Sequence, residues 1–356
     1  MPDFENTNKK RLWITISCVC AIVLFVLAIA AYWLLADFYP SVFKKPENTS
    51  EIFKPLISDS DGESVCSDCV RRIIDGVYVE EGKENFYPIA TVIENHIDAR
   101  PALGIGKANF VIEAEAEGSI TRFLAVFADG EDVPEIGPIR SARPYFVDWA
   151  HELSALFAHC GGSPEALVKI IKNNIFDINE FYNETYFWRD KSIEAPHNIY
   201  TSSEKMNEYL EKREIEDGKF FSWKFKDEAI EEERGEDNNI EIIFKAPDYV
   251  ANWEYNKEEN NYIRENGDEE EIKAKNIIIQ YVEAKVIDDE GRLKMQHIGE
   301  GDAVVCLDGK CEKGKWIKKT SSSRTRFYDF EENEFEFNAG TTWIEVVRPE
   351  NEVFIK

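Results

Sequence analysis

The longest apolar stretch of the chain lies close to its N-terminus. Residues 12–36 carry no charged side chain, three basic residues (9–11) stand directly before them, and Asp37 follows. Because a helix rises about 1.5 Å per residue, this stretch can cross the roughly 30 Å hydrocarbon layer of a membrane. Basic flanks stay on the cytoplasmic side of such a helix. The pattern therefore predicts a single-pass membrane helix over 12–36, a cytoplasmic tail over 1–11, and an extracytoplasmic remainder.

Two alternatives to an uncleaved anchor were weighed. A cleaved signal peptide needs a small-x-small site, which residues 28–30 offer, but further apolar residues follow, including Tyr32 and Trp33. A lipoprotein would need a cysteine after the apolar run, whereas Cys18 and Cys20 stand near its start. The uncleaved helix is the interpretation that we prefer.

The next two segments predict a stalk and then an α+β domain. Residues 37–85 are rich in Ser, Asp, Pro and Glu, and are predicted to be a stalk or linker. Residues 86–215 are predicted to be an α+β domain. Its strands are expected at 87–93, 110–116 and 122–127, and its helices are expected to begin at Pro144, at Ser163-Pro164 and in the capping box Thr201–Glu204.

The last third of the chain predicts strands almost throughout. A dense charge run makes 216–238 a predicted linker, and 239–356 a predicted β-rich domain. Its strands are expected at 240–244, 250–255, 262–264, 277–286, 303–307, 314–318, 325–328 and 341–347. The fold class is therefore α+β, with a membrane helix, an α+β domain and a β-rich domain.

The net charge limits the classes of partner that the protein can bind. It is −27, which argues against nucleic acid and anionic membrane surfaces as binding partners. No motif predicts a cofactor, and protein partners are not defined by the sequence. The one membrane contact expected is the helix itself.

Cysteine positions predict one disulfide. Cys306 and Cys311 flank an Asp-Gly turn, so they should face each other on a hairpin and form a bridge. Cys66 and Cys69 form a single CxxC, which favours a local disulfide over zinc because no second pair accompanies it. Cys160 remains, and the pairing of these last three is left open.

Two arginines stand where a helix should begin. Arg140 and Arg143 directly precede Pro144. Free N–H groups at a helix start favour an anion, and guanidinium groups bind carboxylate or phosphate through two parallel hydrogen bonds. The alternative is that both arginines pair with the domain's own carboxylates.

A second helix start follows Gly161-Gly162 and Ser163. Paired glycines allow close approach of a ligand, or simply form a tight turn. His159 and Cys160 are adjacent, but neighbours on a strand point to opposite faces, so a Cys–His nucleophile is not expected.

Other polar groups are weaker candidates. Asp148 and His151 are three apart on the predicted helix, so a carboxylate could orient a histidine base there, or both could lie on a solvated face. The spacing in the run 94–98 matches no metal motif, so no metal site is predicted. Glu113, Glu115 and Glu117 alternate along a strand, but no glycosidase pair can be derived from them.

Several runs in order resemble one family. They are Pro88–Ala90, Ile93–His96, Asp98–Pro101, Glu117–Phe123, Gly137–Arg143, His159–Ser163, Ala195–Thr201, Asn276–Gln280, Gly299–Gly301, Lys315-Trp316 and Gly340–Ile344. Together they resemble the YerB family, also called the DUF3048 family, of bacterial envelope proteins. The resemblance implies two domains and a surface location, without a settled activity. Family members are often lipoproteins, whereas this chain lacks their lipobox. It also carries Cys160 where the family usually has a small apolar residue.

The function expected from these observations is binding of an anionic envelope ligand, such as a glycan or peptidoglycan fragment. The candidate ligand-binding residues are Asn95, His96, Arg100, Arg122, Arg140, Arg143, His159, Gly161, Gly162, Ser163 and His197. One alternative is a hydrolase or transferase on an envelope polymer, with His151 or His197 as base, Asp148 as its partner and the arginines stabilising charge. Another is an envelope scaffold. An enzyme would need a histidine and a carboxylate converging in one cleft.

Overall fold

The structure is a computed structural model that describes residues 69–356, apart from 216, 237–238, 246 and 265–270. The described residues belong to one compact unit. The predicted tail, membrane helix and most of the predicted stalk lie outside them. Among the described residues, no helix is long and apolar enough to cross a membrane.

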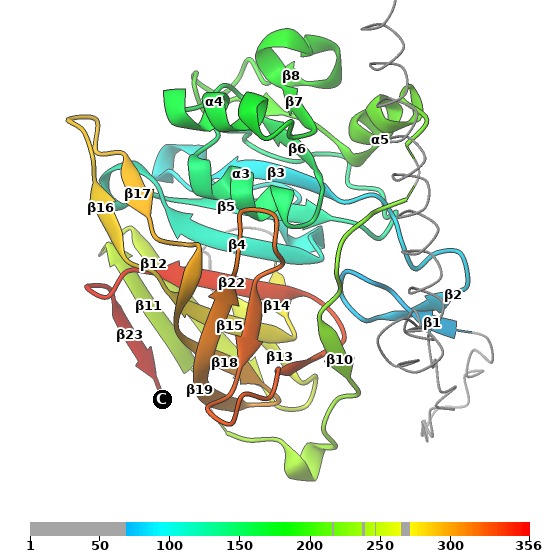
Figure 1. Cartoon of the computed structure of the whole chain (residues 1–356), viewed down its shortest axis with the longest axis vertical. Helices are drawn as coiled ribbons and strands as arrows, with labels where there is room; N and C mark the ends of the chain where they lie inside the picture. The colour runs from blue at the N-terminus through cyan, green and yellow to red at the C-terminus, as the bar shows by residue number, and fades with distance from the viewer. Residues whose placement is uncertain (1–68, 216, 237–238, 246, 265–270) are drawn as a thin grey trace, which may run out of the picture. The chain divides into compact units, whose positions relative to one another are not determined.

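The described part is mainly β, with three α-helices among its described residues (Figure 1). The helices are α3 (Pro144–His151), α4 (Pro164–Lys172) and α5 (Ser203–Glu211). The largest sheet contains β20 (Arg326–Tyr328), β19 (Lys310–Lys318), β18 (Gly299–Leu307), β15 (Asn276–Tyr281), β22 (Thr342–Val347), β4 (Phe110–Glu115), β5 (Thr121–Phe127), β3 (Ile89–Glu94), β6 (Leu156–His159) and β7 (Asp177–Asn179), in that order.

This ten-stranded sheet takes strands from both predicted domains. β22 pairs in parallel with β4, so the last third of the chain joins the first part by backbone hydrogen bonds. The boundary predicted at 216–238 therefore separates two sequence segments that share one sheet. β1 (Cys69–Arg71) and β2 (Tyr78–Glu80), within the predicted stalk, form a separate two-stranded pair in the same compact unit.

The central strands are buried on both faces. Successive residues of a strand point to opposite sides, and in β5 Phe123, Ala125 and Phe127 enter one core while Leu124 and Val126 enter the other. Unbroken apolar runs are typical of strands covered on both faces. This explains why the predicted strands 110–116 and 122–127 carry few polar residues.

Different elements cover the two faces (Figure 1). The first face packs against α5 and a five-stranded sheet of order β14-β13-β12-β11-β23. The second packs against α3 and α4. The bounds in the five-stranded sheet are Ile272–Ala274, Asn261–Arg264, Tyr249–Asn256, Asn239–Lys245 and Glu352–Ile355.

Short strands complete the fold. β16 (Ala284–Val286) and β17 (Leu293–Met295) form a hairpin, β8 (Trp188–Arg189) pairs with β9 (Ile199–Tyr200), and β10 (Lys224–Lys226) pairs with β21 (Glu336–Asn338). The sequence pattern predicted one strand over 277–286, but the structure has β15 and then β16. The break redirects the chain out of the large sheet into the hairpin.

The segment 216–238, predicted to be a charged linker, also contributes to the core. Trp223 is 5% exposed, and its indole N–H donates to the Thr325 carbonyl oxygen. Phe220, Phe221, Trp223 and Phe225 stand close together here, but the charged residues around them predict a linker by composition, so the burial of Trp223 is not expected from the sequence.

The predicted disulfide is present. Cys306 and Cys311 face each other across β18 and β19 and are bonded. Asp308 and Gly309 both have positive φ, as the two-residue hairpin turn requires. Cys69 is also disulfide-bonded, and Cys160 is a free, buried thiol.

Candidate functional site

The loops before α3 and α4 run side by side. The Ala142 N–H donates to the Gly161 carbonyl oxygen at 3.1 Å, and the Ser163 N–H donates to the Ala142 carbonyl oxygen at 3.2 Å. Arg143 is the N-cap of α3 and Ser163 is the N-cap of α4. The two helix starts predicted from sequence therefore lie next to each other.

The glycines make this approach possible. A Cβ on Gly162 would lie 3.2 Å from the Ala142 side chain, closer than ordinary contact. Gly161 has φ +61°, a backbone conformation that favours glycine. Both residues are thus explained by the packing of the two loops.

A cavity of about 330 Å³ opens beside these helix starts. It lies between α3, α4 and the β16–β17 hairpin, which is drawn in gold in Figure 1. We call it the basic cavity, because its charged lining has four Lys or Arg residues and one carboxylate. The lining comprises Arg143, Pro144, Tyr145, Ser163, Glu165, Lys169, Ile287, Arg292, Leu293, Lys294, Met295 and His297.

Carboxylates outside the lining hold three of its cations. Arg143 pairs with Glu117, Lys169 with Asp148 at 2.5 Å, and Arg292 with Asp288 at 3.0 Å. Lys294 has no ion-pair partner among the described residues and is exposed. The lining thus combines positioned cations with one cation available to an incoming anion.

Asp148 lies behind this cavity rather than beside His151. Its Oδ2 accepts from His297 Nε2 at 2.7 Å and from Lys169 Nζ. Burial alone would raise the pKa of Asp148, but these two donors outweigh it and the pKa is lowered. The predicted Asp148–His151 acid–base pair is not formed, because a histidine from far along the chain occupies the carboxylate.

His151 itself has no hydrogen bond at Nδ1 within the described part of the chain. Its ring is half-buried, and burial lowers its pKa despite the nearby Asp148 charge. It does not line the basic cavity. The histidine that pairs with the α3 carboxylate is therefore His297 and not His151.

Arg122 and Arg143 share Glu117. Arg122 NH2 lies 3.0 Å from one Glu117 oxygen, and Arg143 Nε contacts the other. Burial and the nearby Arg143 charge lower the pKa of Arg122 to about 10. Burial would raise the pKa of Glu117, but the two arginines hold it below its usual value. Internal pairing, the alternative raised for the arginines, holds here, although Arg143 also reaches the cavity.

Arg140 and His197 belong to a different cluster. Glu94 accepts from His197 Nδ1 at 2.7 Å and pairs with Arg140 Nε at 2.8 Å. The ring of His197 stacks on His96, with centroids 5.0 Å apart. The lining of the basic cavity includes neither Arg140, His197 nor Gly161, so the predicted ligand-binding residues do not form one site.

The remaining candidates have structural partners. Asn95 bonds Glu113 and Thr121, and Arg100 donates to the Asn95 side-chain oxygen at 3.1 Å. His159 is fully buried, with its ring nitrogens facing the Gly161 carbonyl and Asp177.

Cys160 is not placed as a nucleophile. Burial, with the nearby Glu180 carboxylate, raises the pKa of the Cys160 thiol to about 12. Its sulfur contacts Glu180 at 3.5 Å, whereas His159 faces Asp177. A thiolate is therefore disfavoured, and the adjacent histidine is engaged elsewhere.

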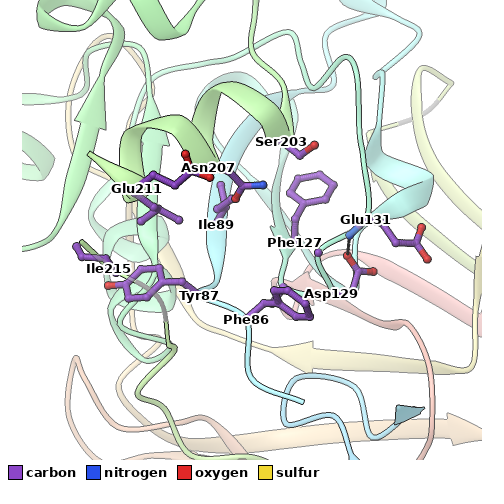
Figure 2. A pocket seen from close by; sticks show the side chains of 13 residues that line it. Phe86, Tyr87, Ile89, Phe127, Asp129, Glu131, Ser203, Asn207, Glu211 and Ile215 are labelled. Carbon is purple, nitrogen blue, oxygen red and sulfur yellow. Dashed lines mark hydrogen bonds between the residues drawn. The ribbon is translucent and has the colours of Figure 1, made fainter. Parts of the chain in front are cut away.

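A second cavity, of about 300 Å³, lies beside α5 (Figure 2). Aromatic side chains of Phe86, Tyr87 and Phe127 form much of its wall. Its charged residues are all carboxylates: Asp129, Glu131 and Glu211. We call it the acidic cavity.

Of the twelve residues that line the basic cavity, only Arg143 and Ser163 were among the predicted ligand-binding residues. Lys169 is in the second helix, and Arg292, Lys294 and His297 come from the hairpin region. No local spacing links residue 143 to residue 294. The sequence indicated this cavity only through the pair Arg140 and Arg143 in an otherwise acidic chain. Such basic pairs are common on solvated surfaces.

The described part of the chain is a mainly β unit with few helices, in which two sequence segments share one sheet and a cavity lies where they meet. Residues 75–216 match the family described as "Protein of unknown function (DUF3048) N-terminal domain", and residues 240–344 match its C-terminal domain. The chain therefore belongs to the DUF3048 family, as the sequence resemblance indicated.

A curated relative and a solved structure agree with this. The Bacillus subtilis (strain 168) protein named "Putative lipoprotein YerB" is 29% identical over 295 residues, covering 77% of this chain and 85% of that protein. The crystal structure of YerB from Bacillus subtilis superposes with a TM-score of 0.71 at 27% identity, covering 80% of this chain and 99% of that one.

Proposed function

We propose that this protein binds a small anionic ligand of the cell envelope, such as a glycan or peptidoglycan fragment, in the basic cavity. The observation that carries the proposal is the charge of the lining. Four Lys or Arg residues and one Glu surround the cavity in a chain of net charge −27. An acidic protein would place carboxylates around an average cavity.

The shape of the cavity supports a ligand with an apolar face. Pro144, Tyr145, Leu293 and Met295 provide an apolar wall, and the four cations of the lining lie beside it. Its volume is at the small end of the roughly 300–1,000 Å³ of typical ligand pockets. A ligand of one or two rings that carries a carboxylate or phosphate fits both features.

The cellular location is part of the proposal. The basic flank at residues 9–11 and the apolar run 12–36 support an extracytoplasmic position, and the relative in Bacillus subtilis is named a lipoprotein. A tag after Lys356 should be cleaved by protease on spheroplasts, whereas a tag before Met1 should be protected. Protection of the C-terminal tag would contradict this location.

The binding test compares two sugars that differ in one acid group. Calorimetric titration should detect N-acetylmuramic acid, which carries a carboxylate, and should detect neutral N-acetylglucosamine weakly or not at all. Replacing Lys294→Gln should weaken the acid's binding about tenfold, because a charge-assisted hydrogen bond contributes roughly 1.5–3 kcal/mol. Inorganic phosphate serves as a second, sugar-free probe.

The matched control is Lys285→Gln. Lys285 faces Lys294 across the same hairpin and is also exposed, but it does not line the cavity. Its replacement should leave affinity unchanged. Equal losses in the two variants would show only a general charge effect, and binding of both sugars alike would contradict the proposal.

A further inference from the structure

We propose that His96, Asp98 and His197 form a binding site for a divalent transition-metal ion, with Zn²⁺ as its probe. The inference does not depend on the proposed function of the basic cavity, since none of the three residues lines it. One potential ligand atom of each residue lies within 4.8 Å of the others.

The distances suit an ion after a small adjustment. His96 Nδ1 and Asp98 Oδ2 are 3.5 Å apart. His96 Nδ1 also accepts the Asp98 N–H at 3.2 Å, and an ion bound at this nitrogen would replace that hydrogen bond. Two ligands of a tetrahedral zinc ion, each about 2.0–2.1 Å from the metal, are separated by roughly 3.3 Å. The Asp98 side chain is 71% exposed, so it can rotate toward an ion without disturbing the core.

The fold brings the two histidines together from distant parts of the sequence. His96 caps the 3₁₀ turn Ile97–Ala99 after β3, and His197 precedes β9. Their rings stack with an interplanar angle of 21°. The side chains of His96 and His197 are 28% and 16% exposed, so the pair is held by the protein yet open to solvent.

Glu94 supplies the outer contact that metal-binding histidines typically have. Its Oε2 is 2.7 Å from His197 Nδ1, which leaves His197 Nε2 for an ion. A carboxylate bonded to the second ring nitrogen fixes the ring and strengthens its donor atom. Arg140 pairs with the other Glu94 oxygen and fixes the carboxylate in turn.

Imidazole and carboxylate donors together match Zn²⁺ and similar ions rather than Ca²⁺ or Mg²⁺, which prefer oxygen ligands alone. Three protein ligands would leave a fourth position for water or another ligand. The sequence pattern predicts no metal here, because the run 94–98 alone has no metal spacing and His197 lies about a hundred residues further on.

The test is a competition titration of the full chain, stripped of metal, with Zn²⁺ against a chromophoric chelator. Wild-type protein should bind one ion more tightly than Asp98→Asn and His197→Asn, each weakened about tenfold or more. Glu94→Gln should weaken binding by roughly 10–100-fold, as outer-contact variants do. With Co²⁺, wild type should show the visible absorption of a histidine-bound ion, and His197→Asn should not.

The control is His151→Asn, which removes a half-buried histidine outside the group and should change nothing. Asp98→Asn alters an exposed side chain, so its fold should match wild type by circular dichroism even where His197→Asn disturbs Glu94. Equal Zn²⁺ binding by wild type and Asp98→Asn, or no binding by wild type, would overturn the proposal.

Discussion

The basic and acidic cavities have similar volumes, about 330 and 300 Å³, but opposite charge. They also lie against opposite faces of the ten-stranded sheet. Tyr145, Leu293 and Met295 of the basic cavity belong to the core that includes α3 and α4. Ile89, Phe127 and Leu210 of the acidic cavity belong to the core that includes α5. Volume alone therefore does not indicate which of the two cavities binds a ligand.

The two cavities are also built differently along the chain. All residues around the acidic cavity come from 86–215, the predicted α+β domain. The basic cavity joins residues 143–169 to 287–297, so it exists only when both sequence segments fold together. A site between two sequence segments depends on the contacts that hold those segments together.

The largest effect is expected at the buried ion cluster beneath α3. Glu152 ends α3 and bonds Lys318 at 2.6 Å and Arg324 at 2.5 Å, with all three side chains nearly inaccessible. Glu152→Ala would leave two buried cations without their carboxylate. It should reduce the free energy of unfolding by roughly 3–5 kcal/mol in urea titrations.

The matched change at the other cavity is Glu211→Ala on α5, an exposed residue of the acidic rim. It should change stability by no more than about 0.5 kcal/mol. Comparable losses in the two variants would show that the two cavity walls are held in similar ways.

The disulfide should matter for stability and for neither cavity. Cys306 and Cys311 close a loop with a sequence separation of five. Replacing both with Ser should cost about 2 kcal/mol by the chain-entropy relation. The affinity of the basic cavity for its anion should not change, since neither cysteine lines it. A loss of affinity would show that the β18–β19 hairpin is coupled to the basic cavity.

The two faces should respond to pH in opposite directions. Burial, with the neighbouring Glu113 charge, raises the pKa of Glu345 to about 8. A raised pKa gives stability that is present below the unfolded value and is lost as pH rises toward 8. On the other face, the lowered pKa of Asp148 gives stability that is lost as pH falls through the acidic range.

Thermal melts of two variants should separate the contributions of Glu345 and Asp148 to the pH dependence of stability. Glu345→Gln imitates the protonated acid, so it should flatten the fall in Tm between about pH 5 and 8. Asp148→Asn should flatten the fall below pH 4. An unchanged pH profile in Glu345→Gln would contradict the assignment of the loss between pH 5 and 8 to this carboxyl group.

A small effect is expected at the contact between the two loops. Gly162→Ala places a methyl group 3.2 Å from the Ala142 side chain, so one loop must shift by a few tenths of an ångström. The cost should be about 1 kcal/mol. Because the shift moves the start of α4, the affinity of the basic cavity for an anion should fall. The acidic-cavity variant Glu211→Ala should leave that affinity unchanged. Unchanged affinity would show that the helix start does not contact the ligand.

Local patterns predicted much of the fold. The apolar runs at 110–116 and 122–127, the Pro-marked helix starts at Pro144 and Pro164, and the Cys306–Cys311 hairpin all depend on short-range chemistry. Those signals act over a few residues, so they are visible in one sequence.

The sites depended on contacts that no local pattern contains. Asp148 was three residues from His151, but the fold gave it His297 instead. His96 met His197, and Arg143 met the hairpin that carries Lys294. Residue spacing gives neighbours on one helix or strand. The contacts of Asp148 and Arg143 arise from the packing of the β16–β17 hairpin region on α3 and α4, whereas His96 and His197 meet within residues 86–215, where the Ile139 N–H donates to the Ile199 carbonyl oxygen.

A crystal of this protein soaked in selenate, with data collected at the selenium absorption edge, would locate a bound anion. We expect an anomalous peak inside the basic cavity, within hydrogen-bond distance of Lys294 and the first turn of α4, and its disappearance in Lys294→Gln. An empty basic cavity, with selenate bound at other surface lysines, would show that the cavity is not an anion-binding site.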